Sequence, residues 1–165
     1  MPIEWLSLPA LTPQQLEHVP QKFSSLKDAA KFALSLASLS DRAIGAVLIS
    51  ELGELLYYGW NTHSEVRTQH AEMNLIRGLA QQGFTKFPPQ SKLVVTLKPC
   101  AMCAGAILRF SEGSSPIEVI YLQDDPGPKA KNSVLMKGSE LWQKAGEPVV
   151  ELTQVKLDPK EIEDY

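Results

Sequence analysis

The residues of this chain that are best suited to chemistry are two cysteines, a histidine and a glutamate in two short stretches. Cys100 and Cys103 are the only cysteines, and they stand in "KPCAMCAG" with two residues between them. His70 and Glu72 stand in "TQHAEMN" with one residue between them. Two thiolates and an imidazole can bind zinc, whereas two nearby thiols can form a redox pair or stay buried and inert. The spacing of the cysteines alone leaves these three interpretations open.

Both stretches are expected in the first turn of a helix. Residues 70–83 and 101–110 each have the apolar spacing of a helix. The second of these helices follows "KLVVTL", a nearly continuous apolar run that is typical of a strand covered on both faces. Open α/β sheets place their sites at the carboxyl ends of the strands. We therefore expect His70, Cys100 and Cys103 to lie at one point there.

The rest of the chain alternates between strand patterns and helix patterns. A hairpin is expected from "AIGAVLIS" and "LLYYGW", with Gly53 in its turn, and Ser25 with Asp28 three residues later predicts the start of an earlier helix. Further strands are expected at "IEVIYL" and "PVVELTQV", with a helix around "SVLMKGSELWQKA" between them. This order predicts an α/β fold, a three-layer α/β/α sandwich with a central mixed five-stranded sheet. We expect residues 1–25 to form an N-terminal extension and residues 26–165 a single domain.

The composition counts against several classes of protein. No segment approaches the ~20 apolar residues that a membrane span needs. The stretch "MPIEWLSLPALTPQQ" has no basic leader followed by an apolar run, so we expect no signal peptide. Two cysteines this close cannot staple a secreted domain, which favours reduced thiols and a cytoplasmic location. The net charge of -3 counts against a large electrostatic surface for nucleic acid.

A zinc site is the interpretation that the histidine and the glutamate favour. Three protein ligands, His70, Cys100 and Cys103, would leave a fourth position open, as in catalytic zinc sites. A helix N-terminus lowers the pKa of a cysteine toward the thiolate that zinc requires. A water in the open position would have its pKa lowered toward ~7. Glu72 is not needed as a ligand and is then placed to take and return protons.

The combination of HxE at 70–72 with PCxxC at 99–103 is the signature of zinc-dependent base deaminases. Over roughly residues 26–135, the wider pattern "AIGAVLIS…GWNTHSEVRTQHAEMN…VVTLKPCAMCAGAIL" resembles the cytidine deaminase-like superfamily. Within it, the branch of tRNA adenosine deaminases and guanine deaminases looks nearest. The resemblance implies one Zn²⁺ per chain, a homodimer, and the hydrolytic replacement of a ring amine by an oxo group with release of ammonia.

Carried over by position, the resemblance implies roles for particular residues. Glu72 would act as the catalytic proton shuttle. The amide of Asn61, in "GWN", would hold the base ring together with the backbone N–H of Ala71. The implied zinc ligands are His70, Cys100 and Cys103.

The substrate stays open between two classes. The net charge of -3, the ending "KEIEDY", and Lys98 where the family usually has an acidic residue favour a small free nucleobase, nucleoside or nucleotide. The stretch "CAMCAGAIL" looks especially like the tRNA adenosine deaminases and keeps adenosine in tRNA as the alternative. A further alternative is a catalytically silent zinc-binding subunit of a deaminase complex, against which Glu72 counts. No membrane partner is expected.

Overall fold

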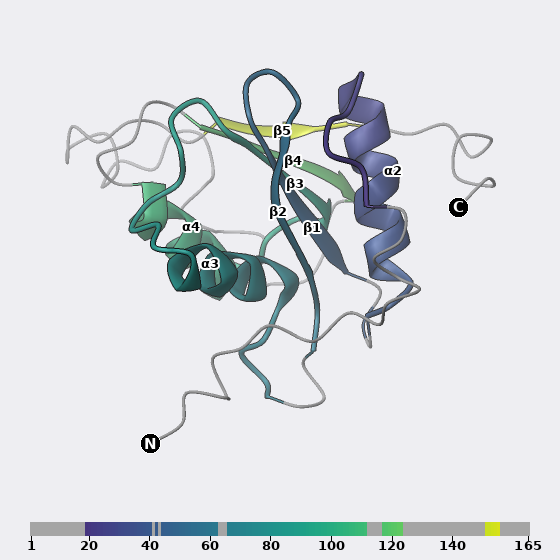
Figure 1. Ribbon diagram of the computed structural model, residues 1–165. Coiled ribbons are helices and arrows are strands. Elements are labelled where there is room, and N and C mark those ends of the chain that lie inside the picture. Colours follow the sequence, from purple (N-terminus) through teal and green to yellow (C-terminus); the bar gives the residue numbers. More distant parts are fainter. Residues whose placement is uncertain are drawn as a thin grey trace.

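A mixed five-stranded sheet forms the centre of the structure (Figure 1), a computed structural model that describes residues 19–40, 42, 44–62, 66–111, 117–123 and 151–155. The strands are β1 (Gly45–Ile49), β2 (Leu55–Trp60), β3 (Lys92–Leu97), β4 (Glu118–Gln123) and β5 (Glu151–Gln154). The described helices are α2 (Leu26–Ala37), α3 (Ala71–Gln81) and α4 (Ala101–Ser111). The predicted fold class is confirmed. The helix expected at 133–145 lies outside the described residues.

The strand order brings the carboxyl ends of β2 and β3 to the same end of the sheet. The order is β2-β1-β3-β4-β5, with β1 antiparallel to both of its neighbours and with β4 and β5 parallel to β3. Trp60 at the end of β2 pairs with Gly45, and Val95 near the end of β3 pairs with Ala46. The chain therefore leaves β2 and β3 on either side of the start of β1.

Helices cover both faces of the sheet. Helix α2 packs on one face, and α3 and α4 lie side by side on the other (Figure 1). Helix α2 begins where the hydroxyl of Ser25 accepts a hydrogen bond from the N–H of Asp28 at 3.2 Å. Such a cap contributes about 1 kcal/mol. The buried side of α2 is rich in alanine, including Ala29, Ala30 and Ala33, so the helix can lie close to the sheet.

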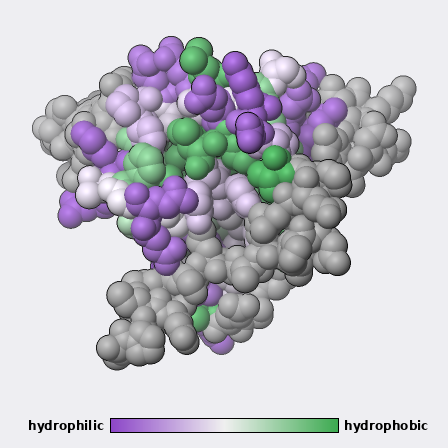
Figure 2. Space-filling view, in the orientation of Figure 1, coloured by the Kyte–Doolittle hydropathy of each residue, from purple (hydrophilic) through white to green (hydrophobic). Residues whose placement is uncertain are grey.

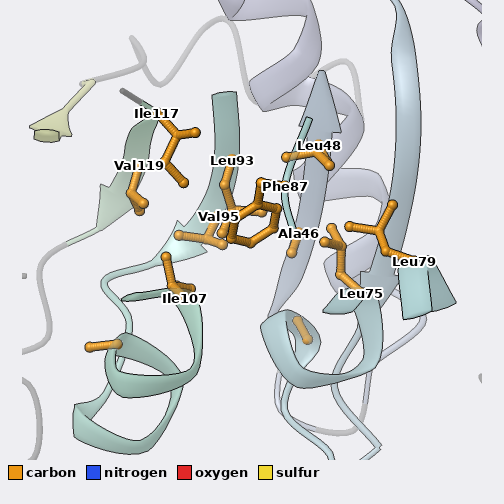
Figure 3. Close-up of a cluster of buried hydrophobic side chains, with 12 residues drawn as sticks. Ala46, Leu48, Leu75, Leu79, Phe87, Leu93, Val95, Ile107, Ile117 and Val119 are labelled. Atoms are coloured by element: carbon orange, nitrogen blue, oxygen red, sulfur yellow. The ribbon is translucent and has the colours of Figure 1, made fainter. Parts of the chain in front are cut away.

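Phe87, in the connection between α3 and β3, fills the space between the sheet and the two helices. Figure 3 shows its ring among Leu93 and Val95 of the sheet, with Leu75 of α3 and Ile107 of α4 around it, and all five side chains are fully buried. Burial of a phenylalanine side chain stabilises a fold by roughly 1.5–3 kcal/mol. Phe87 therefore fixes the position of α3 and α4 on the sheet, and with it the position of their first turns.

The last residues of the expected N-terminal extension pack on the domain. The side chain of Phe23 is buried, and its backbone N–H donates to the carbonyl of Gly53 at 2.8 Å. The N–H of Leu55 donates to the carbonyl of Gln21 at 2.9 Å. The segment just before α2 is therefore attached to the β1–β2 hairpin. The earlier residues of the extension lie outside the described part of the chain.

Apolar surface gathers across the middle of the face shown in Figure 2, over the edge strand β2. The first four residues of β2, Leu55 to Tyr58, are half-buried, and the rings of Tyr57 and Tyr58 stack with centroids 6.0 Å apart. A strand at the edge of a sheet has backbone N–H and C=O groups without a partner strand on one flank, and its side chains have neighbours from a strand on one side only. None of the described helices is long and apolar enough to cross a membrane.

Replacement of Gly45 by alanine should lower the free energy of unfolding. A Cβ atom on Gly45 would collide with the carbonyl oxygen of Ala33 and lie 2.9 Å from the backbone nitrogen of Ala37, so α2 would have to move off the sheet. We expect Gly45→Ala to destabilise the protein by about 2–3 kcal/mol in urea unfolding.

Gly105→Ala is the matched control. It lies inside α4, where a Cβ would meet nothing within 4 Å, so the helix propensity of alanine should stabilise the protein by about 0.5–1 kcal/mol. Equal changes in the two variants would contradict the close packing of α2 on β1.

Candidate metal centre and its surroundings

His70 reaches the site from the connection between β2 and α3. It is the residue immediately before α3, with an extended backbone at φ -73° and ψ 162°, and its side chain makes no capping hydrogen bond to the helix. Its ring is instead directed at α4, where Nδ1 lies 3.6 Å from Cys100 Sγ and 3.5 Å from Cys103 Sγ. The expected meeting of His70 with both cysteines is therefore confirmed in the geometry.

The two cysteines reach the same point at the start of α4. Cys100 directly precedes the helix and its carbonyl accepts the N–H of Ala104 at 2.8 Å, while Cys103 lies in the first turn and is fully buried. Residues 98–100 connect the helix to β3, and the N–H of Lys98 donates to the carbonyl of Gln123 on β4 at 2.9 Å. Both cysteines are free thiols. Strand β3 and its hydrogen bond to β4 thus place the sulfurs.

The three side chains have the spacing of a zinc site. One ligand atom from each of His70, Cys100 and Cys103 lies within 4.8 Å of the others. Bond lengths of about 2.3 Å for zinc–sulfur and about 2.0 Å for zinc–nitrogen, at a tetrahedral angle, separate sulfur and nitrogen by about 3.5 Å. The two nitrogen–sulfur distances of 3.5 and 3.6 Å match this value. No fourth histidine, cysteine or carboxylate joins the group within the described residues, so the donor set fits zinc with one position open.

The two thiols differ in acidity because they share a hydrogen bond. This bond, together with a weaker contribution from His70, lowers the pKa of Cys100 to about 3 against the opposing effect of burial. The same bond and then burial raise the pKa of Cys103. The shared hydrogen bond thus favours the thiolate on Cys100 and the thiol on Cys103. Zinc needs both ligands as thiolates, so metal binding would release the thiol proton.

Hydrogen bonding to Cys100 raises the pKa of His70, an effect that burial and the charge of Arg42 oppose. Arg42 is an exposed residue on the connection between α2 and β1. The residues around Arg42 in the sequence do not indicate that it lies near His70. Arg42 comes close to the site because it precedes β1, and β1 pairs with β3, the strand that leads to the cysteines.

Glu72 lies beside the metal-binding group in the first turn of α3. Its side chain is only 3% exposed. Burial raises the pKa of Glu72, while a hydrogen bond with Cys103 lowers it in part. A carboxyl group whose pKa is shifted up from its usual range is suited to hold a proton and release it near neutral pH. The structure thus places Glu72 in contact with one of the sulfurs and away from water.

Asn61 and Ala71 line the same end of the sheet and are both buried, with Asn61 only 1% exposed. Asn61 follows β2 directly, and its N–H donates to the carbonyl of Ile44 at 3.1 Å. Its carbonyl accepts from the hydroxyl of Ser40 at 3.2 Å. Ala71 is the first residue of α3, where backbone N–H groups have no partner inside the helix. Asn61 thus begins the connection that presents His70, and Ala71 directly follows it.

A buried polar cluster next to this connection has no counterpart in the sequence-based prediction. It consists of Asn74 on α3 with Thr62 and Gln69, which are joined by hydrogen bonds. Asparagine in a helix is ordinarily exposed, so its type gives no signal. Its spacing four residues after His70, on the side of the buried Ala71, could have indicated that it points inward.

The other two histidines of the sequence, His18 and His63, and the loop at 124–132 lie outside the described residues.

Comparisons with known proteins agree with the fold and point to deaminases. The chain is 38% identical over 84 residues to the tRNA-specific adenosine deaminase of Haemophilus influenzae, a match that covers 47% of this chain and 49% of that protein. The chain thus spans about half the length of this relative. A solved structure from work on tRNA:A34 deaminases, which edit adenosine to inosine at the wobble position, superposes with a TM-score of 0.60 at 26% identity and covers 78% of this chain and 97% of that one.

A guanine deaminase structure from Nitrosomonas europaea has the same fold. It superposes with a TM-score of 0.66 at 16% identity and covers 88% of this chain and 86% of that one.

A sequence profile of Bd3614-like deaminases matches residues 36–144, a range that contains both the HxE and the PCxxC stretches. This range is well over half of the 165-residue chain. The chain therefore belongs to the Bd3614-like deaminase family.

Proposed function

We propose that this protein is a zinc-dependent hydrolytic deaminase that converts an amino-bearing nucleobase ring to its oxo form and releases ammonia. One observation carries the proposal. A histidine nitrogen lies 3.5–3.6 Å from each of two cysteine sulfurs, the separation of two zinc ligands, and a buried carboxyl is in contact with one of the sulfurs. Membership of a deaminase family supports the same chemistry.

The residues divide the work among metal binding, proton transfer and substrate orientation. His70, Cys100 and Cys103 would hold the metal, and zinc, when bound, supplies a Lewis acid that lowers the pKa of a water toward ~7. Glu72 takes one proton from the attacking water and passes it to the ring nitrogen beside the amine-bearing carbon. It then takes the remaining proton from the hydroxyl group added to that carbon and gives it to the amine, which leaves as ammonia while the C=O bond forms. The amide of Asn61 would orient the ring. The burial of these groups excludes bulk water and strengthens their electrostatic effect on the transition state.

Two substrate classes remain candidates. A small free base, nucleoside or nucleotide is favoured by the net charge of -3, since tRNA binding needs many cationic contacts to phosphate. Adenosine in tRNA is favoured by the 38% identity to a tRNA-specific adenosine deaminase. Near the site, the amine of Lys98 lies over the ring of Tyr121, 5.8 Å from its centroid. A cation there could contact the phosphate of a free nucleotide or of tRNA.

A catalytically silent subunit is the alternative from another class. Such a protein would use zinc for structure and would leave Glu72 without a role. A carboxyl group that is buried at a cost and kept beside a metal ligand has no structural purpose that an apolar residue could not serve. The position of Glu72 therefore supports an active enzyme.

The homodimer that the family resemblance implies stays a prediction, which analytical ultracentrifugation of the purified protein would test.

Cys103→Ser should remove bound zinc. The purified protein is expected to hold zinc in stoichiometric amount by mass spectrometry under native conditions, and loss of one thiolate from a three-ligand site should abolish tight binding. Met102→Ala is the control, because Met102 is in the same turn, is 37% exposed and belongs to no ligand group. A wild-type protein without zinc that forms a reversible Cys100–Cys103 disulfide would support the redox interpretation instead.

Glu72→Gln should keep the metal and lose the reaction. The amide has nearly the same size but cannot shuttle protons, so we expect the rate of ammonia release to fall by about 10²- to 10⁴-fold. Glu54→Gln, at the hairpin turn on the opposite end of the sheet, should react like the wild type. Activity of Glu72→Gln within a few-fold of the wild type would rule out the proposed role.

The salt dependence of activity should separate the two substrate classes. Ammonia release would be measured with free bases, nucleosides, nucleotides and unmodified tRNA between low and high salt. Activity on tRNA should fall steeply with salt, because phosphate contacts release counterions, whereas activity on a free base should change little. Activity on tRNA alone, with no free ring accepted, would contradict the small-substrate candidate.

A further inference from the structure

Three buried polar side chains join α3 to the connection that carries Asn61 and His70. Asn74, Thr62 and Gln69 are each less than 8% exposed, and we call them the Asn74 cluster. Polar groups at this depth destabilise a fold unless they are hydrogen-bonded. Apolar side chains of the same size would fill the space with a smaller desolvation penalty. Packing alone therefore does not explain why three polar side chains are buried here.

The side-chain amide of Asn74 holds both ends of the connection. Its Nδ2 donates to the carbonyl of Trp60 at 2.7 Å and to Thr62 Oγ1 at 3.0 Å, and it lies 3.4 Å from the carbonyl of Gln69. An amide nitrogen has two hydrogens, so the two shorter contacts are the main bonds and the third is weaker. One side chain on a rigid helix is thus bonded to the residues that leave β2 and contacts the last residue before the site.

The direction of each bond in the cluster is determined. The Thr62 hydroxyl accepts from Asn74, so its own single hydrogen goes to Gln69 Oε1 at 2.9 Å. The backbone N–H of Thr62 also donates to the carbonyl of Gln69 at 2.8 Å. The two ends of the connection are therefore bonded to each other twice as well as to α3.

These bonds surround two of the proposed site residues. Asn61 lies between Trp60 and Thr62, both of which accept from Asn74. His70 follows Gln69 directly, and its carbonyl accepts the backbone N–H of Asn74 at 2.9 Å. Cluster bonds thus reach the residue on each side of Asn61 and the residue before His70.

We propose that Asn74 is a positioning residue, whose side-chain amide, together with Thr62 and Gln69, fixes Asn61 and His70 relative to each other and to α3. The inference rests on the proposed function, because it assigns the cluster to the metal ligand and the substrate-binding residue of that site. Asn74 itself contacts neither metal nor substrate. Groups that orient a metal ligand typically change metal affinity about 10- to 100-fold when they are removed.

The test compares the zinc affinity of variants by competition with a chelator. Thr62→Val removes the hydroxyl and keeps the shape, Thr62→Ser keeps the hydroxyl, and Asn74→Leu removes the amide. We expect zinc affinity to fall about 10- to 100-fold in Thr62→Val and Asn74→Leu and to stay near the wild-type value in Thr62→Ser. Leu79→Ala, a core truncation on the same helix, is the control for lost stability and should keep its zinc affinity. The Thr62 pair decides the matter if Asn74→Leu does not fold.

A second measurement distinguishes failure of this inference from failure of the proposed function. Hydrogen exchange at the N–H groups of Asn61 and Thr62 should be about tenfold faster in Thr62→Val than in Thr62→Ser, with or without zinc. Wild-type zinc affinity in both Thr62→Val and Asn74→Leu would overturn the inference and leave the proposed function intact. A wild-type protein that binds no zinc would overturn the proposed function, and equal exchange rates in the two Thr62 variants would then overturn the inference as well.

Discussion

The contact of one histidine nitrogen with two cysteine sulfurs is the constraint on which the rest of this structure depends. His70 Nδ1 lies 3.5–3.6 Å from sulfurs that are 30 and 33 residues away in the chain. To close that distance, β2 and β3 must end at the same end of the sheet, and they do so because both run antiparallel to β1, which lies between them. Helices α3 and α4 must also lie side by side, and the ring of Phe87 holds them against one sheet face. The sheet topology and the core packing thus bring the N-terminus of α3, next to His70, close to the N-terminus of α4, which carries the cysteines.

The site brings together several groups that carry or can acquire negative charge, an arrangement that a bound cation would stabilise. Three acidic groups lie close together: Cys100, whose pKa is lowered, Cys103, whose pKa is raised, and the buried carboxyl of Glu72. The charge of Cys100 raises the pKa of Glu72 beyond the effect of burial. Like charges at such separations destabilise one another in a poorly solvated interior. A divalent cation reverses this situation, because it stabilises both thiolates and leaves the carboxyl to respond to protons alone. The same arrangement that is costly for an apoprotein is therefore suited to acid–base work beside a metal.

The sequence predicts the meeting of His70 with the two cysteines and the succession of strands and helices along the chain because both follow from local patterns. The pairs at 70–72 and 100–103 have fixed spacing, and the strands and helices that carry them have clear periodicity. Residues whose roles depend on contacts between distant segments are not predictable in this way. Phe87 stands in the loop-like stretch "KFPPQ" yet lies at the centre of the core, and Asn74 is a polar residue in a helix whose partners are up to 14 residues away. The packing of α3 and α4 on the sheet reveals the role of Phe87, and the path of the connection between β2 and α3 reveals that of Asn74.

X-ray absorption at the zinc edge of the purified protein is the most direct test of the central claim. It reports the number, type and distance of the atoms around the metal. Two sulfurs at about 2.3 Å and two nitrogen or oxygen atoms at about 2.0 Å are expected, since one histidine and one exchangeable position complete the donor set. A shell of four sulfurs would mean that zinc joins two chains in a closed structural site. That result, or a protein with no bound zinc, would contradict an open catalytic centre formed by one chain.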